Sequence, residues 1–395
     1  MRHVAALGIT QILGYGAIFY AFPIFVPHVS AEFGVAQSNL YAVFSAGLLL
    51  GGIVASFAGP MLDRFGSAQM MSIGSLLAAL LLGGLGLAPN YLVFSAFVIL
   101  LEALSFLVLY DAAFAALAVG VPKGTRRAIT RLTLIAGFAS TIFWPLTAML
   151  IEALGWRGTY LCYAALHLTI ALPLHRWLAH LIRQQAVSRA PEASVLPIPE
   201  WPLLTGDTAQ RASRALGIAF SLIAIVIAAF GVHLVPVLLA QGLDERAYLV
   251  SMAMGPAQVL IRVIDATLWR HYHPLSVAIF SVAALLMAII ALAFAGGNLA
   301  LALSFAILFG AAQGLTSIVR GAVPLALFGP DRIGRRLGQL AALRNVSAAA
   351  APFAFALGLA QLGLGATLLA CFLLASAGLM LLFWLRHLVQ RSAAS

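Results

Sequence analysis

Six ionisable side chains interrupt apolar stretches of this sequence that are otherwise long enough to lie in a membrane. They are Glu102, Asp111, Arg262, Asp265, Arg320 and Arg344. A charged side chain at the centre of a bilayer costs roughly 2.5–3.5 kcal/mol on insertion scales. Residues that carry this cost are the first candidates for binding a substrate or a coupling ion.

The group around Arg262 has the spacing of one helix face. Gln258 precedes Arg262 by four residues and Asp265 follows it by three. A guanidinium stays charged and can bind a carboxylate through two parallel hydrogen bonds. This spacing predicts that Arg262 contacts a carboxylate substrate directly, or that Arg262 and Asp265 form a structural pair in which Asp265 neutralises Arg262.

A second polar stripe leads up to Arg320. Gln313, Thr316 and Ser317 lie seven, four and three residues before it on an otherwise apolar stretch. Such a stripe faces a water-filled cavity or a neighbouring polar helix, because lipid offers no partner. We expect Arg320 and Gln313 to line the cavity, and helix–helix hydrogen bonding is the alternative.

Two carboxyl groups, Glu102 and Asp111, fall in one predicted helix over residues 91–119. Glu102 lies near the centre, where burial favours the neutral carboxyl, which is the property that a proton carrier needs. Asp111 comes nine residues later, on the opposite side of a continuous helix and near its cytoplasmic end. We predict that Glu102 couples to protons and that Asp111 is a gating residue, with a second proton site as the alternative for Asp111.

The composition identifies the solvent of these helices as lipid. Hydrophobic residues make up 63% of the 395 residues and charged residues 9%, against roughly 45–50% and 25% in soluble domains. Lipid requires every backbone group to be bonded internally, and the apolar runs are continuous, so the predicted spans are helices rather than barrel strands. The sequence predicts an all-α integral membrane protein.

About twelve stretches have the roughly 20 apolar residues that cross the hydrocarbon core. They are residues 4–27, 38–59, 69–88, 91–119, 128–153, 158–176, 214–238, 247–268, 274–295, 299–328, 338–361 and 364–386. With a cytoplasmic amino terminus, only Arg157 and Arg246 of the 22 basic residues fall in external loops. This asymmetry predicts that both termini are cytoplasmic. The net charge of +10 then faces anionic lipids, and no nucleic-acid partner is expected.

The chain is predicted to consist of two pseudo-symmetric six-helix halves, residues 1–176 and 214–395, joined by a proline-rich cytoplasmic linker, residues 177–213. Several features recur at an offset of 209 residues: Pro27 and Pro236, Gly120 and Gly329, and Arg126-Arg127 and Arg335-Arg336. The same offset makes Asp111 the counterpart of Arg320. Repeated halves are common in transporters, whose substrate site lies near mid-membrane.

The segment after the second span reads Gly59-Pro-Met-Leu-Asp63-Arg64-Phe-Gly66. It resembles the G-x-x-x-D-R-x-G signature of the major facilitator superfamily, at the place where that family carries it. The resemblance implies the major facilitator fold and a cytoplasmic latch formed by Asp63 and Arg64. We expect Gly59 and Gly66 to permit a tight turn, and Arg344 to be the partner of Asp63.

The predicted eighth span, with Arg262 and Asp265, loosely resembles the monocarboxylate-porter branch of this family, and Tyr15 in the first span fits the same branch. The order of the two charges differs from that of the animal members. The fifth span lacks the glycine-rich motif of the drug/proton antiporters. The resemblance therefore favours a carboxylate substrate and makes a drug antiporter less favoured.

These observations predict a secondary active transporter that works by alternating access, is coupled to protons and carries a small organic anion such as a monocarboxylate. The alternatives are an efflux antiporter for drugs or toxic ions and a non-transporting receptor or scaffold. The sequence has no H-E-x-x-H, G-x-S-x-G or Walker-type motif, so we expect no enzyme, cofactor or metal site. We expect a monomer in a cell inner membrane.

Overall fold

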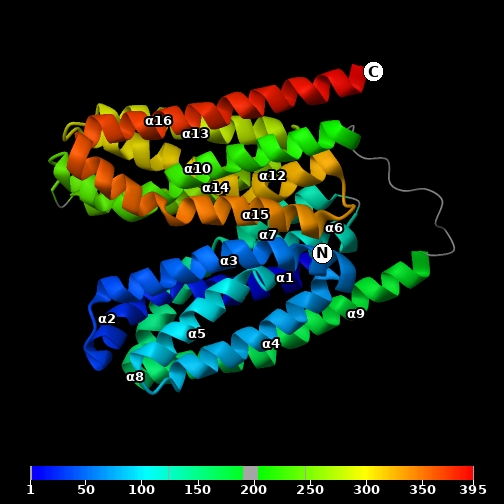
Figure 1. The fold of residues 1–395 in the computed structure, drawn as a ribbon, viewed down its shortest axis with the longest axis horizontal. Coiled ribbons are helices and arrows are strands. Elements are labelled where there is room, and N and C mark those ends of the chain that lie inside the picture. Colours follow the sequence, from blue (N-terminus) through cyan, green and yellow to red (C-terminus); the bar gives the residue numbers. More distant parts are fainter. Residues whose placement is uncertain (1, 123, 190–202, 245, 395) are drawn as a thin grey trace. The chain divides into compact units, whose positions relative to one another are not determined.

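The computed structural model describes residues 2–122, 124–189, 203–244 and 246–394, and its regular structure over these residues is helical (Figure 1). The first part of the chain forms α1 (Arg2–Gly14), η1 (Tyr15–Tyr20), α2 (Phe22–Phe33), α3 (Gln37–Phe65), α4 (Ser67–Gly86), α5 (Tyr91–Leu104), η2 (Ser105–Leu107), α6 (Tyr110–Gly120), α7 (Thr125–Ala136), α8 (Ala139–Leu166), η3 (His167–Ala171) and α9 (Leu172–Arg189). The second part forms α10 (Gly206–Ala240), α11 (Arg246–Met252), α12 (Met254–Thr267), α13 (Pro274–Ala293), α14 (Leu299–Phe328), α15 (Ile333–Ala349) and α16 (Ala351–Ala394).

Ten apolar helical stretches among the described residues are long enough to cross a membrane. Two of them, Thr125–Gln185 and Ile333–Arg391, contain 61 and 59 residues, which is the length of two crossings each. Each is divided by a glycine with left-handed backbone, Gly155 with φ 68° and Gly363 with φ 77°. The predicted class of an all-α membrane protein with about twelve spans is confirmed.

The chain forms two compact units. The N-terminal unit consists of Met1–Ile198 together with Pro330–Ala342, and the C-terminal unit consists of Pro199–Gly329 together with Leu343–Ser395. The first ten residues of α15 thus belong to the N-terminal unit. The middle of the predicted linker lies outside the described residues, while α9 and α10 extend into its two ends.

Small residues allow helices to pack closely within each unit. A Cβ atom added at Gly47 of α3 would come 2.8 Å from Cβ of Glu102 on α5. One added at Gly310 of α14 would come 2.6 Å from the carbonyl oxygen of Met254 on α12. Since lipid provides no hydrophobic driving force between helices, such close crossings are a main source of helix association.

Stacked aromatic rings fill the core of the N-terminal unit. Phe25 of α2 stacks on Tyr160 of α8 with ring centroids 4.0 Å apart, and both side chains are almost fully buried. Phe94 of α5 meets the edge of Trp156 at 5.7 Å. This packing fixes α2, α5 and α8 against one another around the polar residues described below.

Candidate functional site

The predicted helix over residues 91–119 is not continuous, and this prediction was wrong. It is divided into α5, the short 3-10 segment η2, and α6, with Leu109 in extended conformation at φ −90° and ψ −168°. The argument that Glu102 and Asp111 lie on opposite sides of one helix therefore does not apply. No glycine or proline occurs in Ser105–Leu109, so the usual sequence signals of a break are missing.

A side chain from α1 bonds to the backbone at this break. Gln11, which is fully buried, donates from Nε2 to the carbonyl oxygen of Val108 at 2.7 Å. A broken helix leaves carbonyl groups without their intrahelical donors, and such groups need partners when they are buried. Sequence reasoning missed Gln11, although a glutamine within an apolar span is the signal that could have found it.

Glu102 lies two residues before the end of α5 and is only 2% exposed. Its side chain packs against Gly47 of α3, and the phenol of Tyr160 on α8 is near enough to interact with it electrostatically. Within the described residues its carboxyl group has no hydrogen bond or ion pair. A charged carboxylate in such a place would cost several kcal/mol, so this arrangement suits the neutral acid.

Asp111 is the second residue of α6 and is 7% exposed. A carboxylate in the first turn of a helix is favoured by the helix dipole. The neighbouring Tyr110 packs on Tyr15 of η1, with ring centroids 4.6 Å apart, and Tyr15 in turn lies 6.3 Å from Tyr20. The structure thus places Tyr15 against the first residue of α6, next to Asp111, while Glu102 lies on the other side of the break near the end of α5.

The predicted polar residues of the C-terminal unit meet where α12 crosses α14. Gln258 donates from Nε2 to Oε1 of Gln313 at 2.5 Å, and Nε of Arg262 lies 3.4 Å from the carbonyl oxygen of Gly314. Arg262 is 7% exposed and Asp265 1% exposed, so both charges are buried. The structure therefore brings Gln258 and Arg262 of α12 to Gln313 and Gly314 of α14, and it buries Asp265 on α12.

The stripe before Arg320 serves partly in helix packing. Thr316 lies 3.2 Å from the hydroxyl of Ser281 on α13, and Ser281 also donates to the carbonyl oxygen of Ala312. Ser317 donates to the carbonyl oxygen of Gly314 within its own helix. Thr316 thus bonds between helices and Ser317 bonds within its own helix. Arg320 lies about one turn further along α14 and is partly buried.

The predicted latch residue Asp63 binds the amino-terminal end of α15. Its Oδ1 accepts from the backbone N–H of Gly334 and its Oδ2 from that of Arg335, both at 2.7 Å. These donors differ from the expected partner Arg344, which donates to Asn345. Backbone N–H groups in the first turn of a helix have no intrahelical acceptor and can therefore donate to a carboxylate.

Gly59 lies inside α3, whereas we expected it in a turn. A Cβ atom at Gly59 would come 2.5 Å from the carbonyl oxygen of Gly334, so glycine here permits the close approach of α15. Gly66, with φ 88°, provides the turn between α3 and α4. Arg64 is exposed, and its guanidinium lies 5.2 Å from the ring of Phe65.

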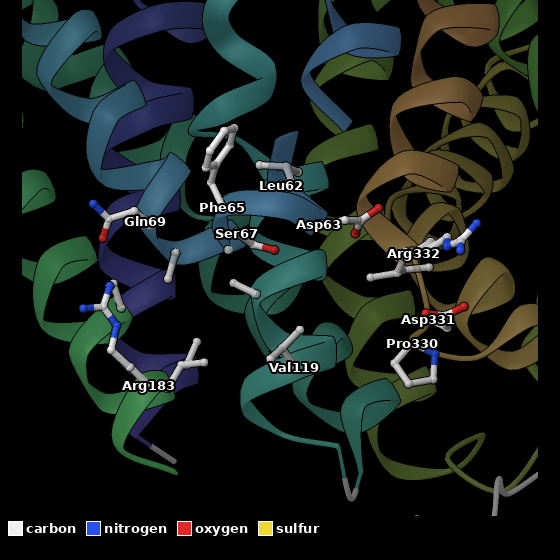
Figure 2. A pocket seen from close by; sticks show the side chains of 16 residues that line it. Leu62, Asp63, Phe65, Ser67, Gln69, Val119, Arg183, Pro330, Asp331 and Arg332 are labelled. Atoms are coloured by element: carbon white, nitrogen blue, oxygen red, sulfur yellow. The ribbon is translucent and has the colours of Figure 1, made fainter. Parts of the chain in front are cut away.

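A cavity of about 400 Å³ adjoins Asp63 in the N-terminal unit. Figure 2 shows Asp63 and Arg332 on one side of it and Arg183 on the other, with Ser67 at the start of α4 between them. Charges of both signs line this space. It borders the latch and contains none of the predicted substrate residues.

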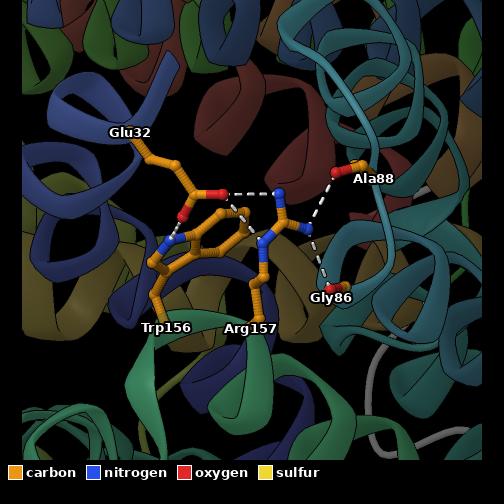
Figure 3. Close-up of polar contacts among 5 residues, drawn as sticks. All are labelled: Glu32, Gly86, Ala88, Trp156 and Arg157. Carbon is orange, nitrogen blue, oxygen red and sulfur yellow. Dashed lines mark hydrogen bonds and ion pairs between the residues drawn. The ribbon is translucent and has the colours of Figure 1, made fainter. Parts of the chain in front are cut away.

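Sequence reasoning also missed a polar network at the start of the helix that follows Gly155 (Figure 3). Arg157 binds Oε1 of Glu32 through Nε and Nη2, at 3.0 and 2.7 Å, and donates from Nη1 to the carbonyl oxygens of Gly86 and Ala88. Trp156 donates to the other oxygen of Glu32 at 2.6 Å. The network ties the end of α2 to the end of α4.

The described residues contain no group of three or more His, Cys, Asp or Glu side chains placed to hold a metal ion. Among the buried polar groups that the structure shows are two carboxyl groups on either side of a helix break and an arginine and an aspartate on α12, and Asp63 caps the start of α15. Such groups can exchange protons, bind an anion and fasten a helix end.

Solved structures of transporters share this fold at low sequence identity. The human organic anion transporter MFSD10 (TETRAN) is 16% identical with a TM-score of 0.75, covering 96% of this chain and 99% of that one. FucP, in the outward conformation, is 13% identical with a TM-score of 0.69, covering 98% and 99%. The proton:xylose symporter XylE, bound to 6-bromo-6-deoxy-D-glucose, is 12% identical with a TM-score of 0.66, covering 96% and 95%.

No curated protein matches the sequence significantly. The family model of the Major Facilitator Superfamily matches residues 7–352, which is most of the chain. Together with the helical fold and the G-x-x-x-D-R-x-G segment, this match shows that the chain is a multi-pass membrane protein belonging to the Major Facilitator Superfamily of transporters.

Proposed function

We propose that this protein is a proton-coupled secondary transporter of a small organic anion, such as a monocarboxylate, and works by alternating access. The observation that carries the proposal is the buried Arg262 on α12. Burying a guanidinium between apolar helices costs free energy, so such a residue is a candidate for a functional role. Its forked donors match the two oxygens of a carboxylate. The similarity in fold to an organic anion transporter is consistent with this substrate class.

Proton coupling is assigned to Glu102. The buried carboxyl, 2% exposed and without a hydrogen bond or ion pair among the described residues, favours the neutral acid in this arrangement. If water reaches the carboxyl group in another conformation, the free-energy cost of the charged form falls there and the proton is released. A group that binds a proton in one conformation and loses it in another couples the proton gradient to the conformational cycle.

Asp63, Arg64, Asp111 and Arg344 are assigned to gating. Asp63 supports this best, because a charge-assisted cap on α15 is a local bond that can be made or broken in the cycle. We further propose a monomer in a cell inner membrane with both termini cytoplasmic, since 17 of the 22 basic residues then face that side.

An efflux antiporter for drugs or toxic ions is the second candidate. It is supported by buried carboxyl groups such as Glu102 and Asp111, which would also suit a cationic substrate. A non-transporting receptor or scaffold is less supported, because helix packing alone gains nothing from buried ionisable groups at Glu102, Arg262 and Asp265.

The binding step tests the anion proposal. Purified protein is screened by thermal shift against acetate, lactate, pyruvate, benzoate, a sugar, an amino acid and a cationic dye, because a bound ligand raises the unfolding temperature. We expect a carboxylate to stabilise the wild type. Arg262→Gln or Arg320→Gln should weaken that binding by about 1.5–3 kcal/mol, the value of a hydrogen bond to a charged group, and Lys should restore part of it. Stabilisation by the dye alone would favour the efflux candidate.

A further inference from the structure

The break between α5 and α6 gives the two buried carboxyl groups, Glu102 and Asp111, different electrostatic environments. Glu102 stands two residues before the carboxyl end of α5, and Asp111 is the second residue of α6. A helix carries partial negative charge at its carboxyl end and partial positive charge at its amino end. The end of α5 therefore repels a charged Glu102, whereas the start of α6 attracts a charged Asp111. In one continuous helix neither effect would exist.

In the part of the chain that the structure describes, the segments of α3 and α4 that pack against α5 bring few ionisable side chains to Glu102. Tyr160 of α8 interacts with it electrostatically, and α4, which packs against α5 and η2, contains no ionisable side chain. The facing part of α3 consists of Gly47 and Gly51, and the ionisable residues of α3 lie toward its ends at Tyr41, Asp63 and Arg64. The end of α5 thus adds an electrostatic influence on this carboxyl to the effect of its burial.

Gln11 is placed to maintain the break. Its amide donates to Val108, the residue before the extended Leu109, and the side chain is fully buried between α1 and the break. Its neighbour Thr10 bonds in a different direction, to Nε2 of His175 on α9 at 2.9 Å. Among the described residues Oε1 of Gln11 has no partner, so the bond that the amide makes here is the one to Val108.

We propose that Gln11 is a positioning residue for proton coupling. Gln11 supplies the donor that the carbonyl group of Val108 lacks, and it thereby stabilises the interruption between α5 and α6. Glu102 is then kept at a helix end, where the neutral acid is favoured. The coupling part of this inference rests on the proposed function of Glu102. The structural part, that Gln11 holds the break, does not.

Hydrogen exchange of the purified protein tests the structural part. Gln11→Met keeps the length of the side chain and removes the amide, and Thr10→Val is the matched control on the adjacent residue. We expect the amides of residues 105–113 to exchange about fivefold to tenfold faster in Gln11→Met, the factor that one net hydrogen bond represents. Thr10→Val should leave these amides unchanged. Equal exchange in Gln11→Met and wild type would overturn the proposal.

Transport in proteoliposomes tests the coupling part, with the carboxylate that binds best in the thermal-shift panel as the probe. Gln11→Met should lower accumulation driven by a pH gradient severalfold while exchange of labelled for unlabelled probe continues. In a Glu102→Gln background, which is not expected to accumulate the probe, the same change should leave exchange of the probe unimpaired. Loss of exchange in either background, or undiminished accumulation in Gln11→Met alone, would contradict the positioning role. If wild type carries none of the probes, the proposed function fails, and hydrogen exchange still decides whether Gln11 holds the break.

Discussion

The carboxylate of Asp63 caps α15 at Gly334: Oδ1 accepts from the backbone N–H of Gly334, and Oδ2 accepts from the next N–H along, each at 2.7 Å. Two residues far apart in the sequence are thereby joined within the N-terminal unit. The glycine at position 334 is needed for the contact, because an added Cβ would come 2.7 Å from Oδ1 of Asp63. The contact that Asp63 makes is therefore a helix cap rather than an ion pair between side chains.

Removing the charge of this cap should slow the transport cycle. Asp63→Asn leaves one acceptor oxygen and replaces the other with an amide that cannot accept from Arg335. We expect the capped arrangement to lose about 0.5–2 kcal/mol, and the rate of probe exchange in proteoliposomes to fall with it. Asp331→Asn, in the loop before α15, is the control and should change little. A loss of carboxylate binding in Asp63→Asn would place this residue in the substrate site instead.

The crossing of α3 and α15 should tolerate no side chain at Gly338. A Cβ atom there would collide with the carbonyl oxygen of Ala55 and would come 2.9 Å from Cα of Gly59. We expect Gly338→Ala to lower the free energy of unfolding by about 1–3 kcal/mol, as overpacking does. Gly365→Ala, with open space around it, should be neutral. Thermal unfolding in detergent measures both, and equal midpoints would argue against the close crossing.

The sequence predicted the spans well because crossing the bilayer requires long apolar runs, which are visible in any window. The role of Asp63 as a latch stays a prediction, and the donors that it binds could not be predicted, since backbone N–H groups of a distant helix leave no trace in side-chain spacing. The break at Ser105–Leu109 could not be predicted, because none of its residues is a glycine or proline. The partners of Gln11 and Glu32 could not be predicted for another reason: Val108 and Arg157 are 97 and 125 residues away from them in the sequence.

The network around Arg157 should contribute to the stability of the N-terminal unit. Arg157→Lys keeps the charge and loses the fork that binds Glu32 and the carbonyl oxygens of Gly86 and Ala88. The side chain of Arg157 is 34% exposed and that of Glu32 is 42% exposed, so solvent screens this ion pair. We expect a loss of about 1 kcal/mol, chiefly from the hydrogen bonds to backbone carbonyls. The loss is measured as a lower unfolding temperature, and Glu152→Gln, which lies before the division of α8 at Gly155, serves as the control.

The orientation in the membrane can be tested with single cysteines in a background without Cys162 and Cys371. Gln361 precedes the break at Gly363, and Gln210 lies in the first turns of α10; both are exposed. We predict that cysteine at position 361 is labelled by an impermeant maleimide from outside intact cells. Cysteine at position 210 should be labelled only after the membrane is opened. Labelling of both from outside would contradict cytoplasmic termini.

The most direct test of proton-coupled anion transport is uptake into proteoliposomes under an imposed pH gradient. The probe is the radiolabelled carboxylate that stabilises the protein best, and Glu102→Gln mimics the permanently protonated acid. We predict that wild-type protein accumulates the probe above its external concentration only while the gradient lasts. Glu102→Gln should not accumulate it and should still exchange internal for external probe. Accumulation that does not depend on the pH gradient, or that is the same in Glu102→Gln as in wild type, would contradict proton coupling through Glu102.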